Sequence, residues 1–229
     1  MAYTLLRHQP SGAELYIQVL GEMGHTIEPE AFHVAHQPAR ELYMRSTREG
    51  RDFEASMSNA VEFWTEYNVL VLRGLGIPEA LHGELAELMY RRAWHPQNWQ
   101  IFPEVVATLE ELWRRGIPMA VVSNFVDTLS AVCERHGITR YFETIVCSAE
   151  VGSMKPDPRI FGIACRRLGV DPAETWHVGD NYWADVLGAR AAGITPVLID
   201  RDGVLPRPDC LSVSSLDQVL SLLDREVAA

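Results

Sequence analysis

Between residues 12 and 92 the apolar positions recur at steps of three and four residues, which is the period of an amphipathic helix. Residues 12–24 show this period, and Pro29 suits the first turn of the next helix. The clearest stripe consists of Phe53, Met57, Val61, Trp64 and Tyr67. No stretch of this block alternates as a half-buried strand does. We therefore expect a short entry segment at residues 1–11 and an all-helical domain at residues 12–95.

After Phe102 the pattern changes, because short runs rich in Val and Ile alternate with helical segments. The runs lie at 119–122, 144–147, 175–178 and 195–199, and the helical segments at 103–115, 127–136, 158–168, 184–192 and 216–226. The runs lack polar alternation, as expected of strands buried on both faces. Residues 96–229 are therefore predicted to form a Rossmann-like α/β domain with a doubly wound parallel sheet.

Polar residues follow three of these predicted strands. Ser123 and Asn124 follow the first, Lys155 stands in the proline-rich loop after the second, and Asp180 and Asp185 follow the third. The carboxyl ends of parallel strands meet at one edge of a sheet, where ligands bind. Two carboxylates suit a hard cation such as Mg²⁺, while a hydroxyl, an amide, helix N–H groups and a lysine suit phosphate. Taken singly, these residues are equally typical of helix caps and a surface lysine.

Composition excludes several classes of protein. The 229 residues are 47% hydrophobic and carry a formal net charge of −11, so a nucleic-acid-binding surface is not expected. No apolar run approaches the roughly 20 residues that span a bilayer, and no leader sequence is visible, so we expect a soluble cytoplasmic protein without membrane contact. The four cysteines are dispersed and show no zinc or disulfide spacing.

Three motifs resemble those of the haloacid dehalogenase-like (HAD) hydrolase superfamily, in the same order. They are Val121-Val122-Ser123-Asn124, Lys155-Pro156-Asp157-Pro158 and Gly179-Asp180-Asn181-Tyr182-Trp183-Ala184-Asp185. Within the superfamily, residues 4–7, 94–96 and 179–182 resemble the branch named haloacid dehalogenase-like hydrolase domain-containing proteins. The resemblance implies an α/β core with an inserted helical cap and hydrolysis of a small phosphorylated metabolite through an aspartyl-phosphate.

The resemblance also assigns roles to residues. It implies that Asp180 and Asp185 hold Mg²⁺, that Lys155 steadies the nucleophile and the phosphate, and that the phosphoryl group is bound by Ser123 or Asn124, together with Thr4. Tyr182 and Trp183 are candidates for packing on the cap or on a second subunit, so a homodimer stays open.

The first motif of the family is an apolar strand that ends in Asp-x-Asp-x-Thr-Leu. Thr4 and Leu5 align with its Thr-Leu, so the acid/base position falls on Ala2 and the nucleophile would precede Met1. The strand would lie between those ending at Val122 and Val178, and without it these two would stand apart or pair directly. One hypothesis is that the natural protein extends upstream. The other is an inactive pseudo-enzyme that keeps phosphate and metal binding.

Two further alternatives concern the chemistry. Asp127 and Asp157 lie near the expected edge, but neither ends a strand that faces the acidic pair, so neither is expected to replace the nucleophile. Dehalogenases of the superfamily lack the second acid of the first motif, as this chain does at Ala2. The acidic pair at Asp180 and Asp185 nevertheless favours the metal-dependent phosphatases over the dehalogenases.

Overall fold

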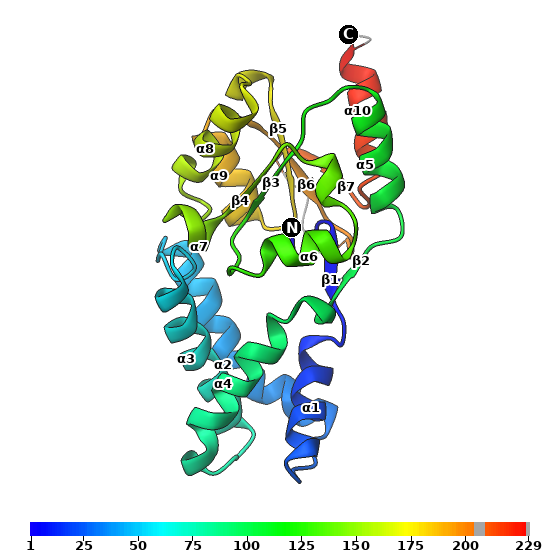
Figure 1. Ribbon diagram of the computed structural model, residues 1–229. Helices are drawn as coiled ribbons and strands as arrows, with labels where there is room; N and C mark the ends of the chain where they lie inside the picture. Colours follow the sequence, from blue (N-terminus) through cyan, green and yellow to red (C-terminus); the bar gives the residue numbers. More distant parts are fainter. Residues whose placement is uncertain (204–208, 228–229) are drawn as a thin grey trace.

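The computed structural model describes residues 1–203 and 209–227. A helical part lies below an α/β part (Figure 1). The helical part consists of α1 (Gly12–Glu22), α2 (Pro29–Arg48), α3 (Met57–Gly74), the 3₁₀ turn η1 (Glu79–Leu81) and α4 (His82–Ala93). Residues 12–92, all of them described, contain no strand, as predicted.

Capping residues fix where these helices begin. Ser11 accepts a hydrogen bond from the Glu14 N–H (3.3 Å), while the Glu14 carboxylate accepts one from the Ser11 N–H (2.7 Å). Pro29 occupies the first position of α2, and Ser56 caps α3. The apolar stripes of the four helices meet in one cluster that includes Leu15, Val19, Leu20, Phe32, Val71, Leu72, Leu85 and Met89.

Two short antiparallel strands join the helical part to the rest of the chain. They are β1 (Leu6–His8) and β2 (Trp99–Ile101), with Leu6 opposite Ile101. The chain enters the helical part after β1 and returns through the turn η2 (Pro96–Asn98) and β2. The sequence did not predict these strands, because three residues are too few to show a period.

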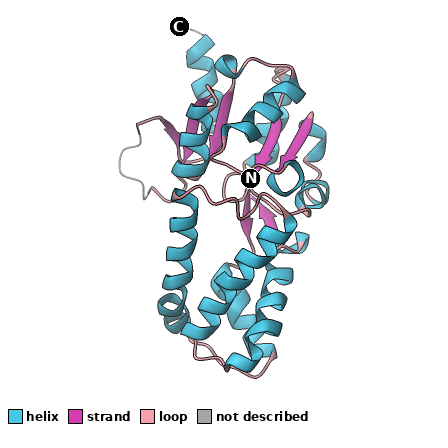
Figure 2. Ribbon diagram, turned by 90° about the vertical axis from the view of Figure 1, so that its left-hand side faces the viewer, coloured by secondary structure: helices cyan, strands magenta, loops and turns pink. Residues whose placement is uncertain are grey.

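Among its described residues, the α/β part contains five parallel strands in two groups. The first group is β3 (Ala120–Ser123) with β4 (Thr144–Cys147), and the second is β5 (Trp176–Gly179), β6 (Thr195–Ile199) and β7 (Leu211–Val213) in that order. Four of these strands confirm the predicted runs, while β7 was not predicted. Helices flank both groups (Figure 2): α5 (Val105–Arg114), α6 (Leu129–Arg135), η3 (Thr139–Tyr141), α7 (Ser148–Val151), α8 (Pro158–Leu168), η4 (Pro172–Glu174), the π-helical η5 (Tyr182–Leu187), α9 (Gly188–Ala191) and α10 (Gln218–Val227).

A cavity of about 500 Å³ separates the two groups of strands. Among the described residues, β3 pairs only with β4 and β5 only with β6. The cavity is lined by both inner strands, including Val122 and Val178, and by residues of α5, α8 and α10. Val122 and Val178 are only half-buried, because each stands in the strand of its group that borders the cavity. Of the two arrangements expected without a strand at this place, the structure has the separated one, and a strand before Met1 stays a prediction.

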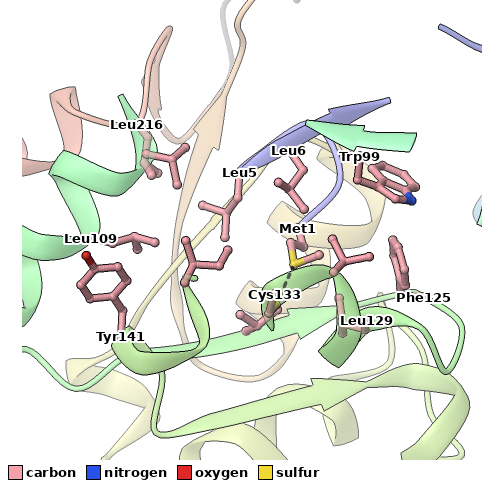
Figure 3. Close-up of a cluster of buried hydrophobic side chains, with 14 of the residues drawn as sticks. Met1, Leu5, Leu6, Trp99, Leu109, Phe125, Leu129, Cys133, Tyr141 and Leu216 are labelled. Atoms are coloured by element: carbon pink, nitrogen blue, oxygen red, sulfur yellow. Dashed lines mark hydrogen bonds between the residues drawn. The ribbon is translucent and has the colours of Figure 1, made fainter. Parts of the chain in front are cut away.

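Most of the first eight residues pack against the α/β part, although the Tyr3 and Arg7 side chains are exposed. Met1, Leu5 and Leu6 are buried beside Leu129 and Cys133 (Figure 3), and the Cys133 thiol donates to the Met1 sulfur at 3.6 Å. The Arg201 guanidinium donates to the carbonyl oxygens of Tyr3 (3.1 Å) and Thr4 (2.6 Å). These contacts hold Thr4 at the end of the cavity, next to the carboxyl ends of the strands.

Candidate functional site

The acidic pair stands at the carboxyl end of β5. Asn181, not Asp180, caps the following helix, since its side-chain oxygen accepts from the N–H groups of Trp183 and Ala184, both at 3.0 Å. The explanation of Asp180 as a helix cap is therefore wrong. Asp185 lies in the first turn, and its side chain folds back to accept from the Asn181 N–H at 2.9 Å.

Glycine is required at position 179 because Asp185 packs against it. A Cβ atom there would lie 2.2 Å from Cγ of Asp185, a distance that real Cβ contacts do not reach. The absent side chain therefore lets the Asp185 carboxylate lie directly over the end of β5.

Lys155 forms a buried ion pair with Asp185. Its ammonium contacts Oδ1 of Asp185, and both side chains are less than a tenth exposed. His177, from β5, also contacts Oδ1, with its Nε2 at 2.8 Å. Burial acts against ionisation, but the Lys155 ammonium and the His177 hydrogen bond together hold the pKa of Asp185 well below its usual range. Burial lowers the pKa of His177 despite Asp185, so this ring is neutral at pH 7.

Asn124 fixes the backbone of Lys155. Its amide nitrogen donates to the Lys155 carbonyl (2.9 Å), and its amide oxygen accepts from the Lys155 N–H (2.7 Å). Ser123 is the last residue of β3 and is buried, and among the described residues its hydroxyl has only a long 3.5 Å contact with the Asn124 carbonyl. Of the two predicted phosphate ligands, Ser123 therefore has the freer side chain, while the Asn124 amide is engaged with Lys155.

The helix after Asn124 begins later than predicted. The sequence indicated a helix over 127–136, with its N–H groups beside Ser123, whereas α6 spans Leu129–Arg135. In the segment between Asn124 and α6, the Phe125 N–H donates to the Ser148 hydroxyl at 3.0 Å. Anion binding by the N–H groups of this helix stays a prediction.

Asp180 keeps one carboxylate oxygen available. Its Oδ1 accepts from the Thr4 hydroxyl at 2.8 Å, and no hydrogen bond to Oδ2 occurs within residues 1–203 and 209–227. Burial and the neighbouring Asp185 raise the pKa of Asp180. A divalent cation would relieve this cost of keeping two buried carboxylates ionised together.

The donor set fits Mg²⁺ in kind. In the part of the chain that the structure describes, no three His, Cys, Asp or Glu side chains cluster as a metal cage. Both oxygens of Asp185 accept hydrogen bonds, whereas one oxygen of Asp180 has no hydrogen-bond partner among the described residues, so Asp180 offers the freer carboxylate of the pair. Mg²⁺ is commonly bound by one or two carboxylates together with waters and substrate phosphate, which matches this arrangement.

The structure brings the predicted residues together through contacts: Thr4 with Asp180, Asn124 with Lys155, and Lys155 with Asp185. Two other predicted aspartates stand elsewhere. Asp157 caps α8 by accepting from the Arg159 N–H at 2.8 Å, and Asp127 is exposed. Within the described residues neither side chain hydrogen-bonds to Asp180 or Asp185, in line with the expectation that neither replaces a nucleophile.

Two residues near the site were not predicted. His177 is a polar residue inside an apolar run, which is a signal that the sequence offered. Glu54 stands between α2 and α3 and is only 3% exposed. A single acid between aromatic positions gives no sign of burial in the sequence, so only the fold reveals it.

The helical part also touches the α/β part near η5. The Arg48 guanidinium, from α2, lies 5.7 Å from the centre of the Trp183 ring. The neighbouring Tyr182 instead contacts the α/β part, since its hydroxyl donates to Asp209 at 3.0 Å. Trp183 thus contacts the helical part, as one of the two alternatives proposed, and is 40% exposed. A homodimer stays a prediction. No helix among the described residues has the length and apolar character needed to cross a membrane.

Comparisons with known proteins agree with this geometry. Residues 4–193 match the family model described as haloacid dehalogenase-like hydrolase. The chain is 31% identical over 198 residues to human haloacid dehalogenase-like hydrolase domain-containing protein 3, covering 86% of this chain and 78% of that protein. It is 34% identical over 174 residues to a phosphoserine phosphatase of Thermus thermophilus, covering 76% and 68%.

A solved structure shows the same fold. The 2-haloacid dehalogenase of Pseudomonas syringae pv. Tomato DC3000 superimposes with a TM-score of 0.63 at 26% identity, over 99% of this chain and 96% of that one. The relatives therefore include proteins named for phosphate-ester hydrolysis and for dehalogenation.

Proposed function

Because the chain belongs to the haloacid dehalogenase-like hydrolase family, we propose that it serves as a Mg²⁺-dependent phosphatase-type hydrolase of small phosphorylated metabolites. The observation that carries the proposal is the buried Lys155–Asp185 ion pair beside the half-free carboxylate of Asp180, at the carboxyl ends of β4 and β5. The phosphatases among the relatives support the same reaction class.

Each residue then has a task that follows from its contacts. Asp180 would hold Mg²⁺ through the oxygen that Thr4 does not occupy, and the bound ion would supply positive charge against the phosphoryl oxygens. Lys155 supplies a positive charge whose position is fixed by Asp185 and by Asn124. Ser123 offers a hydroxyl donor to a phosphoryl oxygen. These groups are fixed before the ligand arrives, which is the condition for electrostatic stabilisation of a transition state.

The covalent step needs a carboxylate beside Lys155 and the metal. The family's first motif would supply it, and its alignment puts this position before Met1. In our proposal residues 1–229 bind Mg²⁺ and phosphate, and turnover depends on that added carboxylate. The second candidate function, a binding protein without turnover, shares the same site and differs only in this step.

Binding and turnover of residues 1–229 are therefore measured separately. Calorimetry with Mg²⁺ and inorganic phosphate is expected to show phosphate binding that needs Mg²⁺ and is lost in Asp180→Asn, while exposed Asp127→Asn serves as the matched control. Absence of binding in the unchanged protein contradicts the proposed site. Hydrolysis of p-nitrophenyl phosphate that disappears in Asp180→Asn would instead show that residues 1–229 already hold a nucleophile.

Dehalogenation is tested on the same protein. Halide release from 2-chloropropionate, measured with an ion-selective electrode, is expected to stay at the level of buffer, because residues 1–229 lack the first-motif carboxylate on which the covalent step depends. If halide is released and its rate does not change when Mg²⁺ is removed, the protein is a dehalogenase and the phosphatase proposal is wrong.

A further inference from the structure

Glu54 carries a buried carboxylate next to the candidate site. It lies in the loop between α2 and α3, and its backbone N–H contacts the Met154 sulfur at 3.2 Å. Met154 directly precedes Lys155 and packs with Leu42, Phe53 and Phe63 of the helical part. The loop that carries Glu54 therefore rests on the segment that carries Lys155.

The carboxylate of Glu54 has no cationic partner. Its Oε1 accepts a hydrogen bond from the Trp64 indole N–H at 3.1 Å, and among the described residues neither oxygen forms an ion pair. Burial raises the pKa of Glu54 to about 7, although Trp64 and the charge of Lys155 act against this. The ammonium of Lys155 is itself paired with Asp185. A buried acid without a cation is costly unless a ligand supplies one.

Aromatic rings pack around Trp64, the residue that holds this carboxylate. The Trp64 ring lies 6.0 Å from the Tyr43 ring and 5.5 Å from the Trp94 ring, between centres. Trp94 in turn lies 6.5 Å from Tyr90, whose buried hydroxyl has no hydrogen-bond partner in the described structure. Aromatic faces attract organic cations, and a carboxylate among them adds a full negative charge.

The charges of Lys155, Asp180 and Asp185, which form the proposed phosphate and metal site, influence pKa values near Glu54. Burial, and then the charges of Glu54, Asp180 and Asp185, raise the pKa of Tyr43. The pKa of Tyr43 therefore responds to the charge of Glu54 and to the charges of Asp180 and Asp185. The charge of Lys155 in turn acts to lower the pKa of Glu54. The contact of the Glu54 backbone with Met154, the residue before Lys155, places this acid beside the end of the site that is proposed to bind phosphate.

We propose that Glu54, together with the rings of Trp64 and Tyr43, binds the protonated amino group of the substrate, so that the substrate class is a phosphate monoester bearing a primary amine. The inference rests on the proposed function for the phosphate end. The indole N–H of Trp64 holds one carboxylate oxygen, and the other accepts from the ammonium. A phosphate ester without an amino group lacks this contact and leaves the buried acid without a cation.

Two ligands of nearly equal size test the proposal. Calorimetry with Mg²⁺ at pH 8 compares O-phosphoethanolamine with ethyl phosphate on the unchanged protein, and we expect the amine to bind at least tenfold tighter. Glu54→Gln is expected to remove this preference while the dissociation constant for ethyl phosphate changes less than twofold. Asp52→Asn, at an exposed acid two residues away, is the control and is expected to keep the preference.

The outcomes separate the two proposals. Equal binding of both ligands by the unchanged protein overturns the role of Glu54 but leaves the phosphate site intact, and this comparison needs no variant. Preference that survives in Glu54→Gln also overturns the role of Glu54. Binding of neither ligand overturns the proposed function and this inference together. Trp64→Phe, which removes the indole donor, is a second variant and is expected to weaken the preference.

Discussion

The stability of the protein should fall between pH 5 and pH 8 because of one buried side chain, Glu54. Burial raises its pKa from the ordinary 4.5 to about 7. A raised pKa in the folded state means that folding favours the protonated acid. This contribution is complete below pH 4.5, and it is lost as the pH rises through about 7.

The magnitude follows from the two pKa values. The difference between about 7 and 4.5, at about 1.4 kcal/mol for each pH unit, amounts to about 3 kcal/mol. Most of this, roughly 2 kcal/mol, is lost between pH 5 and pH 8. Glu54→Gln has no titrating group at this position, so the unfolding free energy of the unchanged protein should fall relative to the variant by that amount.

Urea unfolding of both proteins without Mg²⁺ measures this difference. The other titratable groups that interact with Glu54 are present in both proteins, so their own titration largely cancels; they are Tyr43, Tyr90, Cys147 and Lys155. Asp52→Asn, at an exposed position, should track the unchanged protein at every pH. A difference between Glu54→Gln and the unchanged protein that does not depend on pH would refute the reasoning, because Glu54 would then ionise near 4.5.

Three further results are expected. Gly179→Ala, whose Cβ would collide with Asp185, should lower stability by about 1–3 kcal/mol in thermal unfolding, whereas Gly83→Ala, with open space around it, should not. Asn124→Ala removes two hydrogen bonds to Lys155 and should cost about 1–3 kcal/mol and weaken phosphate binding measured by calorimetry; unchanged binding would contradict the positioning role. A five-residue apolar extension before Met1 should enter the cavity, raise the urea midpoint and slow amide exchange in β3 and β5, which a polar extension of equal length should not do.

Much of the α/β part was predictable because its elements are long enough to show a pattern. The strands at 144–147 and 195–199 and the helix at 158–168 are found with the predicted ends. Strands β1, β2 and β7 have three residues each and carry no period. Their positions depend on pairing with distant partners, which local sequence does not encode.

The candidate site was predictable where its chemistry follows a strand end. Lys155, Asp180 and Asp185 follow predicted strands, and the parallel sheet brings such residues to one edge. His177 and Glu54 were missed because their importance comes from burial against other parts of the chain. The same holds for Asn124, whose amide proved to hold Lys155 rather than to stand free.

The polar edge also joins the two halves of the α/β part. Across the cavity, no backbone hydrogen bonds link β3 to β5 in the described residues. At the carboxyl ends, however, Lys155 follows β4 and is tied to Asn124 after β3, while its ammonium reaches Asp185 after β5. Removing one partner of a buried ion pair leaves the other charge uncompensated, at a cost of about 3–5 kcal/mol. The residues proposed to bind phosphate and metal therefore also connect the two strand groups. Substitutions at Lys155 or Asp185 should lower the free energy of unfolding as well as weaken binding at the site.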